Sequence, residues 1–171
     1  MPKHTVTYVR NLSLVLCLSV FSIIWPAFAQ TKPIFSPDAN AQILADVYAQ
    51  EAVDMAKKAF DISLDWSDSS IANVEKALAM MHSSFITTNP RPTDDQAMSF
   101  AKLYGSYIGE VYRRNHGGEW GVVNLNKQEF LGLQTTAGDI FWPWGRALNR
   151  ITQGPENDVA YYYRALLQRQ P

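Results

Sequence analysis

One helix is specified more completely than any other part of this chain, and it limits the folds that the chain can adopt. The segment Thr93-Asp94-Asp95-Gln96 is a capping box, in which the Thr and Gln side chains satisfy backbone groups at the start of a helix. Further along, Gly117-Gly118 provides the residue type at which helices commonly end. We therefore expect a long helix from Thr93 to about Asn115, against which the other elements pack.

Two helices are expected before this one. Residues 38–60 place apolar side chains along one face at helical spacing. Ser67 suits the N-cap of a second helix, which fades near Ser83-Ser84. The loop that follows contains Asn89-Pro90-Arg91-Pro92, which cannot continue a helix.

After the glycines the pattern changes from helix to strand. Residues 119–123 and 129–134 are predicted to be two strands joined by a turn, and residues 140–142 a third short strand. Two helices are expected to follow, over residues 144–153 and 157–169. The sequence thus predicts an α+β fold: three helices, a small three-stranded antiparallel meander, then two helices.

The N-terminus is typical of a secretory signal peptide. Lys3 and Arg10 precede an apolar run that ends at Ala27-Phe28-Ala29, whose small residues suit signal peptidase. The run is shorter than the roughly 20 residues that a membrane-spanning helix needs. We expect cleavage between Ala29 and Gln30, which makes the working form periplasmic or secreted, with no membrane span. The predicted divisions are a signal peptide (1–29), a flexible leader (30–37) and a single α+β domain (38–171).

The composition of the mature chain argues against several classes of function. Cleavage removes Cys17, the only cysteine, so neither a disulfide nor thiol chemistry is expected. Without Lys3 and Arg10, 13 basic residues remain against 16 acidic ones, a formal charge of −3 that does not suit nucleic acid. His82 and His116 are the only histidines left, and no phosphate-binding or dinucleotide motif is present. We therefore expect no metal and no cofactor.

The central helix also carries a recognisable motif. Residues 105–111 read Gly-Ser-Tyr-Ile-Gly-Glu-Val, and the basic residues after them lead into Gly117-Gly118-Glu119-Trp120. This stretch resembles a set of bacterial domains of unknown function that share a G-x-Y-x-G-E-V helix followed by G-G-x-W, with a counterpart of their F/W-P-x-x-R turn at residues 141–146. The resemblance covers residues 65–168 and implies a shared fold, but it implies no activity. The signal peptide is a departure, because many of these domains look cytoplasmic.

Two glycines within the central helix need an explanation. Gly105 and Gly109 are four positions apart and share one helix face, and each costs helix stability about 1 kcal/mol. We expect the close approach of a neighbouring helix or strand to offset that cost. The alternative is a groove in which a ligand meets the helix backbone.

The charged residues near this helix allow two interpretations. Glu110 is placed to pair with Arg113 and Arg114 at i+3 and i+4, and a buried Glu110 held by Arg146 would be a structural ion pair or a binding site. Glu110 and Glu119 facing a common groove would instead suit glycoside cleavage. His116, at the helix end, suits a capping role better than a catalytic one.

The aromatic residues allow a recognition surface as well as a core. Trp120, Trp142, Trp144 and Tyr161–Tyr163 are typical of a small α+β core, yet any that are exposed would favour recognition of a protein or sugar. The leading hypothesis is an exported, non-enzymatic domain that binds another protein, one version being an immunity or inhibitor protein against a toxin of the cell envelope. The alternatives are a cell-wall glycan hydrolase and an envelope structural factor. The candidate binding residues are Tyr107, Glu110, Arg114, His116, Glu119, Trp120, Trp142, Trp144 and Arg146.

Overall fold

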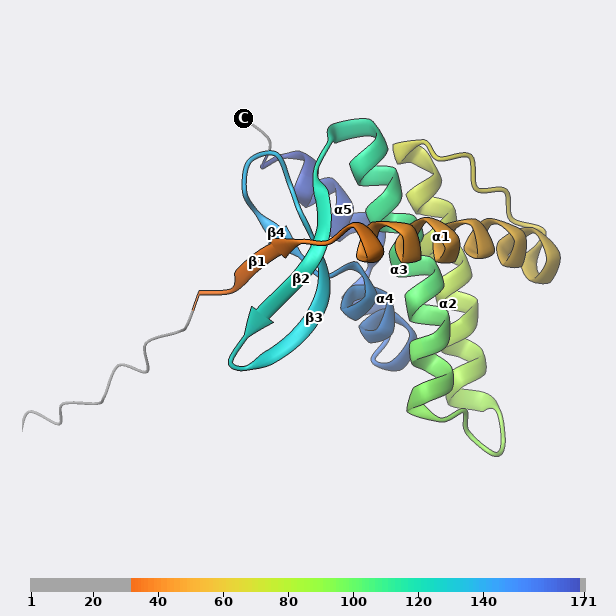
Figure 1. Cartoon of the computed structure of the whole chain (residues 1–171). Helices are drawn as coiled ribbons and strands as arrows, with labels where there is room; N and C mark the ends of the chain where they lie inside the picture. Colours follow the sequence, from red (N-terminus) through yellow and green to blue (C-terminus); the bar gives the residue numbers. More distant parts are fainter. Residues whose placement is uncertain (1–31, 170–171) are drawn as a thin grey trace, which may run out of the picture. The chain divides into compact units, whose positions relative to one another are not determined.

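The computed structural model describes residues 32–169 (Figure 1), which belong to one unit. The predicted signal peptide and its cleavage site lie outside the described residues. The strands are β1 (Ile34–Pro37), β2 (Glu119–Leu125), β3 (Gln128–Gln134) and β4 (Ile140–Phe141). The α-helices are α1 (Ala39–Phe60), α2 (Ile71–Thr87), α3 (Asp94–His116), α4 (Pro143–Thr152) and α5 (Val159–Leu167), with short 3-10 turns η1 (Asp68–Ser70) and η2 (Pro155–Asn157).

The α+β class is confirmed, and the layout differs from the prediction at its start. The sheet has four antiparallel strands in the order β1-β2-β3-β4, and its first strand precedes all the helices. This strand, Ile34–Pro37, lies in the segment predicted to be a flexible leader, and Phe35 pairs with Val123. The prediction of three strands was wrong because a four-residue segment shows no clear alternation, and its partner is far away in the sequence.

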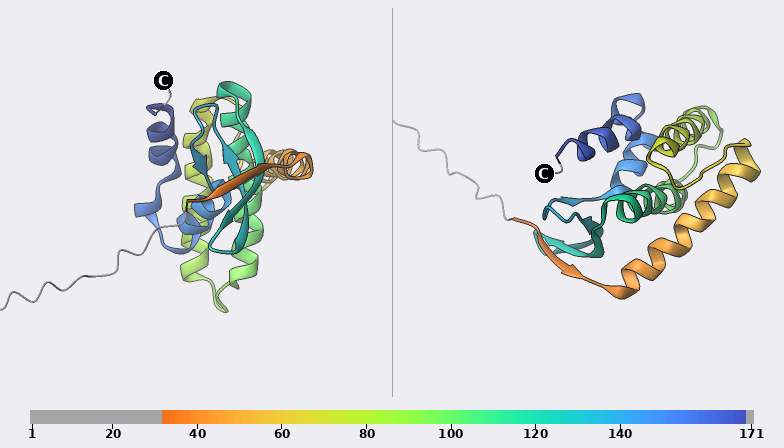
Figure 2. Two further views of the ribbon diagram at one scale, coloured as in Figure 1. Left: turned by 60° about the vertical axis from the view of Figure 1, so that its left-hand side comes forward. Right: turned by 90° about the horizontal axis from the view of Figure 1, so that it is seen from above.

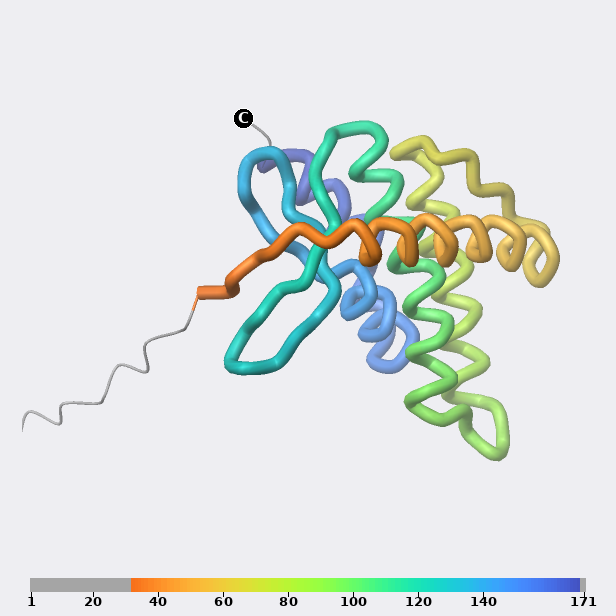
Figure 3. The backbone as a smooth tube through the Cα atoms, viewed as in Figure 1, coloured from red at the N-terminus to blue at the C-terminus, as the bar shows by residue number. Residues whose placement is uncertain are grey.

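The strands β2 and β3 form a hairpin closed by a two-residue turn. Asn126 and Lys127 have φ values of 54° and 65°, as the turns that match the twist of paired strands require. The predicted turn is therefore present, and both strands extend to it. After β3 the chain turns back through β4 and passes directly into α4, as the tube view makes clear (Figure 3).

Helix α3 is the centre of the helical part. The predicted capping box is present, since the Thr93 hydroxyl accepts from the Gln96 backbone at 3.2 Å and the Gln96 side chain accepts from the Thr93 backbone at 2.9 Å. Seen from above, α3 lies between α1 and α4 (Figure 2). The sheet packs on α3 through its buried side chains Trp120, Leu133 and Phe141.

Close packing explains both glycines of α3. A Cβ atom on Gly105 would lie 2.7 Å from backbone atoms of Trp144, at the start of α4. A Cβ atom on Gly109 would lie 2.2 Å from Cζ2 of Trp120, on β2. The predicted close approach is confirmed at both positions, and it involves one helix and one strand.

A partly buried ion pair joins α2, α4 and α5. Glu75 of α2 accepts a hydrogen bond of 2.6 Å from Nε of Arg150 on α4, and its second oxygen accepts one of 2.9 Å from the backbone of Val159, the first residue of α5. One carboxylate thus fixes the positions of two helices. Among residues 32–169, no helix combines the length and the apolar character needed to cross a membrane.

Candidate functional site

The carboxylate of Glu110 is the most highly coordinated polar group of the motif on α3. Its side chain has no exposed surface. Arg113 donates from Nε and Nη2 at 2.9 Å each, Arg114 donates from Nε at 3.1 Å, Gln42 donates at 2.9 Å, and the indole of Trp120 donates at 2.8 Å. These donors come from α1, α3 and β2, so one side chain joins three elements.

Arg114 extends this cluster toward the surface. Its Nη2 lies 3.1 Å from a carboxylate oxygen of Asp46 on α1, and its guanidinium lies 3.7 Å above the ring of Trp66. The other neighbour of that ring is Tyr107, whose centroid is 4.8 Å away and whose hydroxyl accepts from the Trp66 backbone at 2.8 Å. Tyr107, Glu110, Arg114 and Trp120 are therefore brought together, as parts of a mostly buried polar network.

The environment of Glu110 does not suit a general acid. Burial by itself would raise the pKa of this carboxyl, but its interactions with Arg113, Asp46 and Gln42 lower it to about 2. A carboxyl acid catalyst needs the opposite shift. Glu119 is exposed and lines a polar depression of about 370 Å³ together with Gln42, Arg113 and Trp120, and Glu110 is not part of that lining. The structure thus gives no support to this carboxylate pair as a catalytic site.

Arg146 does not hold Glu110. Its guanidinium lies 4.0 Å above the ring of Tyr162 on α5, and the arginines that hold Glu110 are Arg113 and Arg114, from its own helix. The predicted pairing at i+3 and i+4 is confirmed. The pairing with Arg146 that the sequence also allowed is not formed, because that residue is in α4 and its guanidinium lies over Tyr162.

His116 belongs to a second polar cluster, which the sequence did not indicate. Its Nε2 lies 3.0 Å from both carboxylate oxygens of Asp68 in η1. Asp68 also accepts hydrogen bonds from Tyr163 at 2.6 Å and from Asn115 at 3.2 Å. Burial raises the pKa of Asp68, but these hydrogen bonds outweigh it and hold the pKa below its ordinary value. The cluster joins η1, the end of α3 and α5, and we interpret it as structural.

We expect Tyr163→Phe to lower the free energy of unfolding by about 2 kcal/mol, because it removes a hydrogen bond to a charged carboxylate from a buried side chain. Urea denaturation at pH 7 measures the change. Tyr161→Phe is the matched control, since Tyr161 is 69% exposed on the same helix and its hydroxyl should matter little. Equal effects of the two substitutions would contradict this role of Asp68.

An open groove contains the other two predicted tryptophans. It has a volume of about 580 Å³ and lies where β3, α3 and the first turn of α4 meet. Trp142 and Trp144 are half-buried in its wall, and Phe130 is 43% exposed. The lining residues are Met98, Lys102, Leu125, Glu129, Phe130, Leu131, Trp142, Trp144, Gly145 and Leu148.

Contacts with side chains of α1 and α3 fix the position of Trp144. Its indole nitrogen donates to the Ser106 hydroxyl at 2.8 Å, its ring packs 5.9 Å from that of Tyr48, and Nζ of Lys102 lies 5.7 Å from its centroid. The indole nitrogen of Trp142 is buried and has no hydrogen-bond partner among residues 32–169. The groove is therefore preformed and apolar, with Lys102 and Glu129 as its charged residues.

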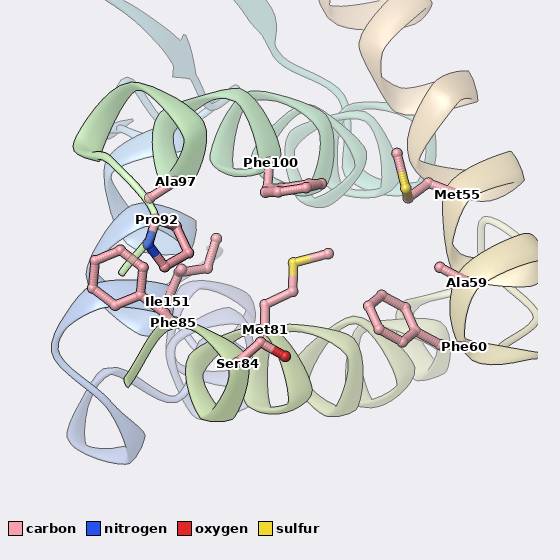
Figure 4. A pocket seen from close by; sticks show the side chains of 10 residues that line it. All are labelled: Met55, Ala59, Phe60, Met81, Ser84, Phe85, Pro92, Ala97, Phe100 and Ile151. Carbon is pink, nitrogen blue, oxygen red and sulfur yellow. The ribbon is translucent and has the colours of Figure 1, made fainter. Parts of the chain in front are cut away.

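A smaller cavity of about 220 Å³ lies between α1, α2 and α3 (Figure 4). Met55, Met81 and Phe100 point into it, and Ser84 is the one polar side chain of its wall. It contains none of the predicted site residues. With so few polar groups to orient a ligand, it is a weaker candidate than the aromatic groove.

The nine candidate binding residues predicted from the sequence do not form one site. Trp142 and Trp144 line the groove, four residues form the Glu110 network, and His116, Glu119 and Arg146 lie elsewhere. The sequence did not single out Phe130, Leu131 and Leu148, because apolar residues of this kind are usually core. Within the described range, no group of three or more His, Cys, Asp or Glu side chains is placed to hold a metal ion.

Comparisons with known proteins give a fold likeness only. No protein-family model matches the chain, and no curated protein matches it at a significant level. A crystal structure from Bacteroides thetaiotaomicron VPI-5482 superposes with a TM-score of 0.59 at 12% sequence identity. The match covers 82% of this chain and 49% of that one, so this chain spans about half the length of the solved structure that it resembles.

Proposed function

We propose that this chain is an exported, non-enzymatic domain that binds another protein through its aromatic groove. The observation that supports this most directly is the groove itself, because an open apolar concavity with two half-buried tryptophans is typical of a recognition site. The export signal predicted at residues 1–29 places the interaction in the periplasm or outside the cell. An immunity or inhibitor protein against an envelope-acting toxin remains one version of this proposal.

The polar clusters support a binding role more than a catalytic one. Glu110 is fully buried and held as a carboxylate, and His116 is engaged by Asp68. Neither cluster opens into the groove that would hold a substrate, since none of these three residues lines it. A protein partner fits better than a polar small molecule, because Lys102 and Glu129 are the only charged residues in the groove wall.

We expect Phe130→Ser to lower recovery of the partner about tenfold or more, because it removes an exposed apolar contact from the groove. The measurement is a crosslinked pull-down of tagged mature protein from native envelope, followed by mass spectrometry. Tyr161→Ser is the matched control, since it removes an exposed aromatic side chain from α5, outside the groove.

Two outcomes would contradict the proposal. Equal recovery of one partner with both variants would place the interface elsewhere on the surface. The absence of any saturable protein partner, with glycan fragments retained instead, would favour the wall-hydrolase alternative.

A further inference from the structure

We infer that the groove receives an extended segment of the partner polypeptide, which adds as a strand to the uncovered edge of β3. This inference rests on the proposed function and specifies how the partner binds. The reason to expect a strand, and not merely an apolar patch, is that the groove and an unpaired sheet edge share the same residues.

The outer edge of β3 is only partly paired. Along its whole length β3 pairs with β2, but on its other side β4 pairs only with Leu133 and Gln134. The chain leaves the sheet at Trp142, the N-cap of α4, and Pro143 begins that helix. Residues 128–132 therefore have no strand beside them on this side within the described range, and we call them the free edge.

The free edge has little of the usual protection of an edge strand. Natural edge strands are blunted by proline, by charged side chains, above all lysine, or by a covering helix or loop, and Glu129 is the one charged residue of this edge. Residues 128–132 read Gln-Glu-Phe-Leu-Gly, with neither proline nor lysine. Because alternate residues of a strand direct their N–H and C=O groups outward, this edge offers backbone donors and acceptors to a neighbour.

The groove supplies the side-chain recognition that such a strand needs. Glu129, Phe130 and Leu131 of the free edge line one wall, and Trp144 and Gly145 of α4 belong to the other. A segment in line with β4 would thus place alternate side chains in an apolar groove of about 580 Å³ while its backbone pairs with β3. An apolar small molecule would fill the groove but leave the edge unpaired.

A phage-displayed library of linear random 12-residue peptides tests this inference, with panning on the mature protein. We expect enriched peptides to bind the protein and to protect the outward-facing backbone amides of the free edge, those of Glu129 and Leu131, from hydrogen exchange. N-methylation of alternate peptide amides then tests the pairing directly. Methylation along one edge of the peptide should weaken binding at least tenfold, whereas methylation along its other edge should leave affinity within about twofold.

Several results would overturn the inference. These are a library without any enriched peptide, binding that is insensitive to methylation on either edge, and protection of residues 128–132 that depends on protein concentration without peptide. The last result would identify a second copy of this chain as the occupant. If the envelope partner is lost with Phe130→Ser but these tests fail, the binding function stands and the strand mode alone is wrong.

Discussion

Replacing Glu110 with Gln is expected to lower the free energy of unfolding by about 3 kcal/mol. The substitution keeps the size of the side chain but leaves Arg113 and Arg114 without the carboxylate that their Nε and Nη2 groups contact at 2.9–3.1 Å. Removing one partner of a buried ion pair typically costs about 3–5 kcal/mol, and the low end applies here because the Arg113 and Arg114 side chains are 30% and 36% exposed. Urea denaturation followed by tryptophan fluorescence measures the loss at pH 7.

The stability difference between wild type and Glu110→Gln should depend on pH. The folded protein holds the pKa of Glu110 at about 2, below its ordinary value of 4.5. The stabilisation is therefore fully present above pH 4.5 and is lost as the pH falls toward 2. The difference between wild type and Glu110→Gln should shrink over that window. A difference that stays constant down to pH 2 would contradict the role of the ionised carboxylate.

Asp46→Asn is the matched control for Glu110→Gln. Asp46 pairs with Arg114 of the same cluster at 3.1 Å, but its side chain is 45% exposed. Exposed ion pairs contribute about 0–1 kcal/mol, so this variant should remain near wild-type stability. A loss as large as that of Glu110→Gln would mean that the network depends on its surface pair.

Replacing Gly109 with Ala is expected to lower the free energy of unfolding by about 2 kcal/mol or more, although Ala favours helix by about 1 kcal/mol. The added Cβ atom would lie 2.2 Å from Cζ2 of Trp120. Trp120 is 2% exposed and its indole donates to Glu110 at 2.8 Å. A shift of the buried ring would disturb that hydrogen bond, and a shift of the backbone would disturb the packing of β2 on α3, so either way of relieving the contact costs stability.

Gly145→Ala separates this packing effect from helix propensity. Gly145 is also helical, but the nearest atom to its Cβ position is 3.9 Å away, on Trp142. We expect this variant to be as stable as wild type or up to about 1 kcal/mol more stable. Thermal unfolding of both variants provides the comparison. A stabilised Gly109→Ala variant would mean that Trp120 is free to move.

Signals between neighbouring residues in the sequence predicted most of the helices. The sequence did not indicate the contacts between segments that are far apart along the chain. The capping box at Thr93 and the i+3 and i+4 arginines depend on neighbouring residues, so the sequence was sufficient. The strand at Ile34–Pro37 exists because it pairs with β2. Asp68 gains its partners from α3 and α5, and no spacing in the sequence indicates that convergence.

The candidate groove likewise combines residues that the sequence indicated with residues that only the structure places there. The sequence indicated Trp142 and Trp144 as aromatic residues that would favour recognition if exposed, and both line the groove. Phe130 did not, because an aromatic residue in a strand is usually buried. In the structure Phe130 is 43% exposed, and it lies on the part of β3 beyond the two residues that pair with β4. The extent of that pairing depends on the path of the chain in three dimensions.

The position of β1 also determines when the protein can fold during its synthesis. β1 and α1 are made early, but β1 pairs with β2, and α1 packs chiefly on α3. Gln42 of α1 likewise donates its shorter hydrogen bond, of 2.9 Å, to Glu110 of α3. α1 therefore gains its main partner only when the chain through His116 has been made, and β1 gains its partner only when the chain through about Leu125 has been made. The first elements to be synthesised thus depend on the middle of the chain for their stability, and folding cannot proceed in order from the N-terminus.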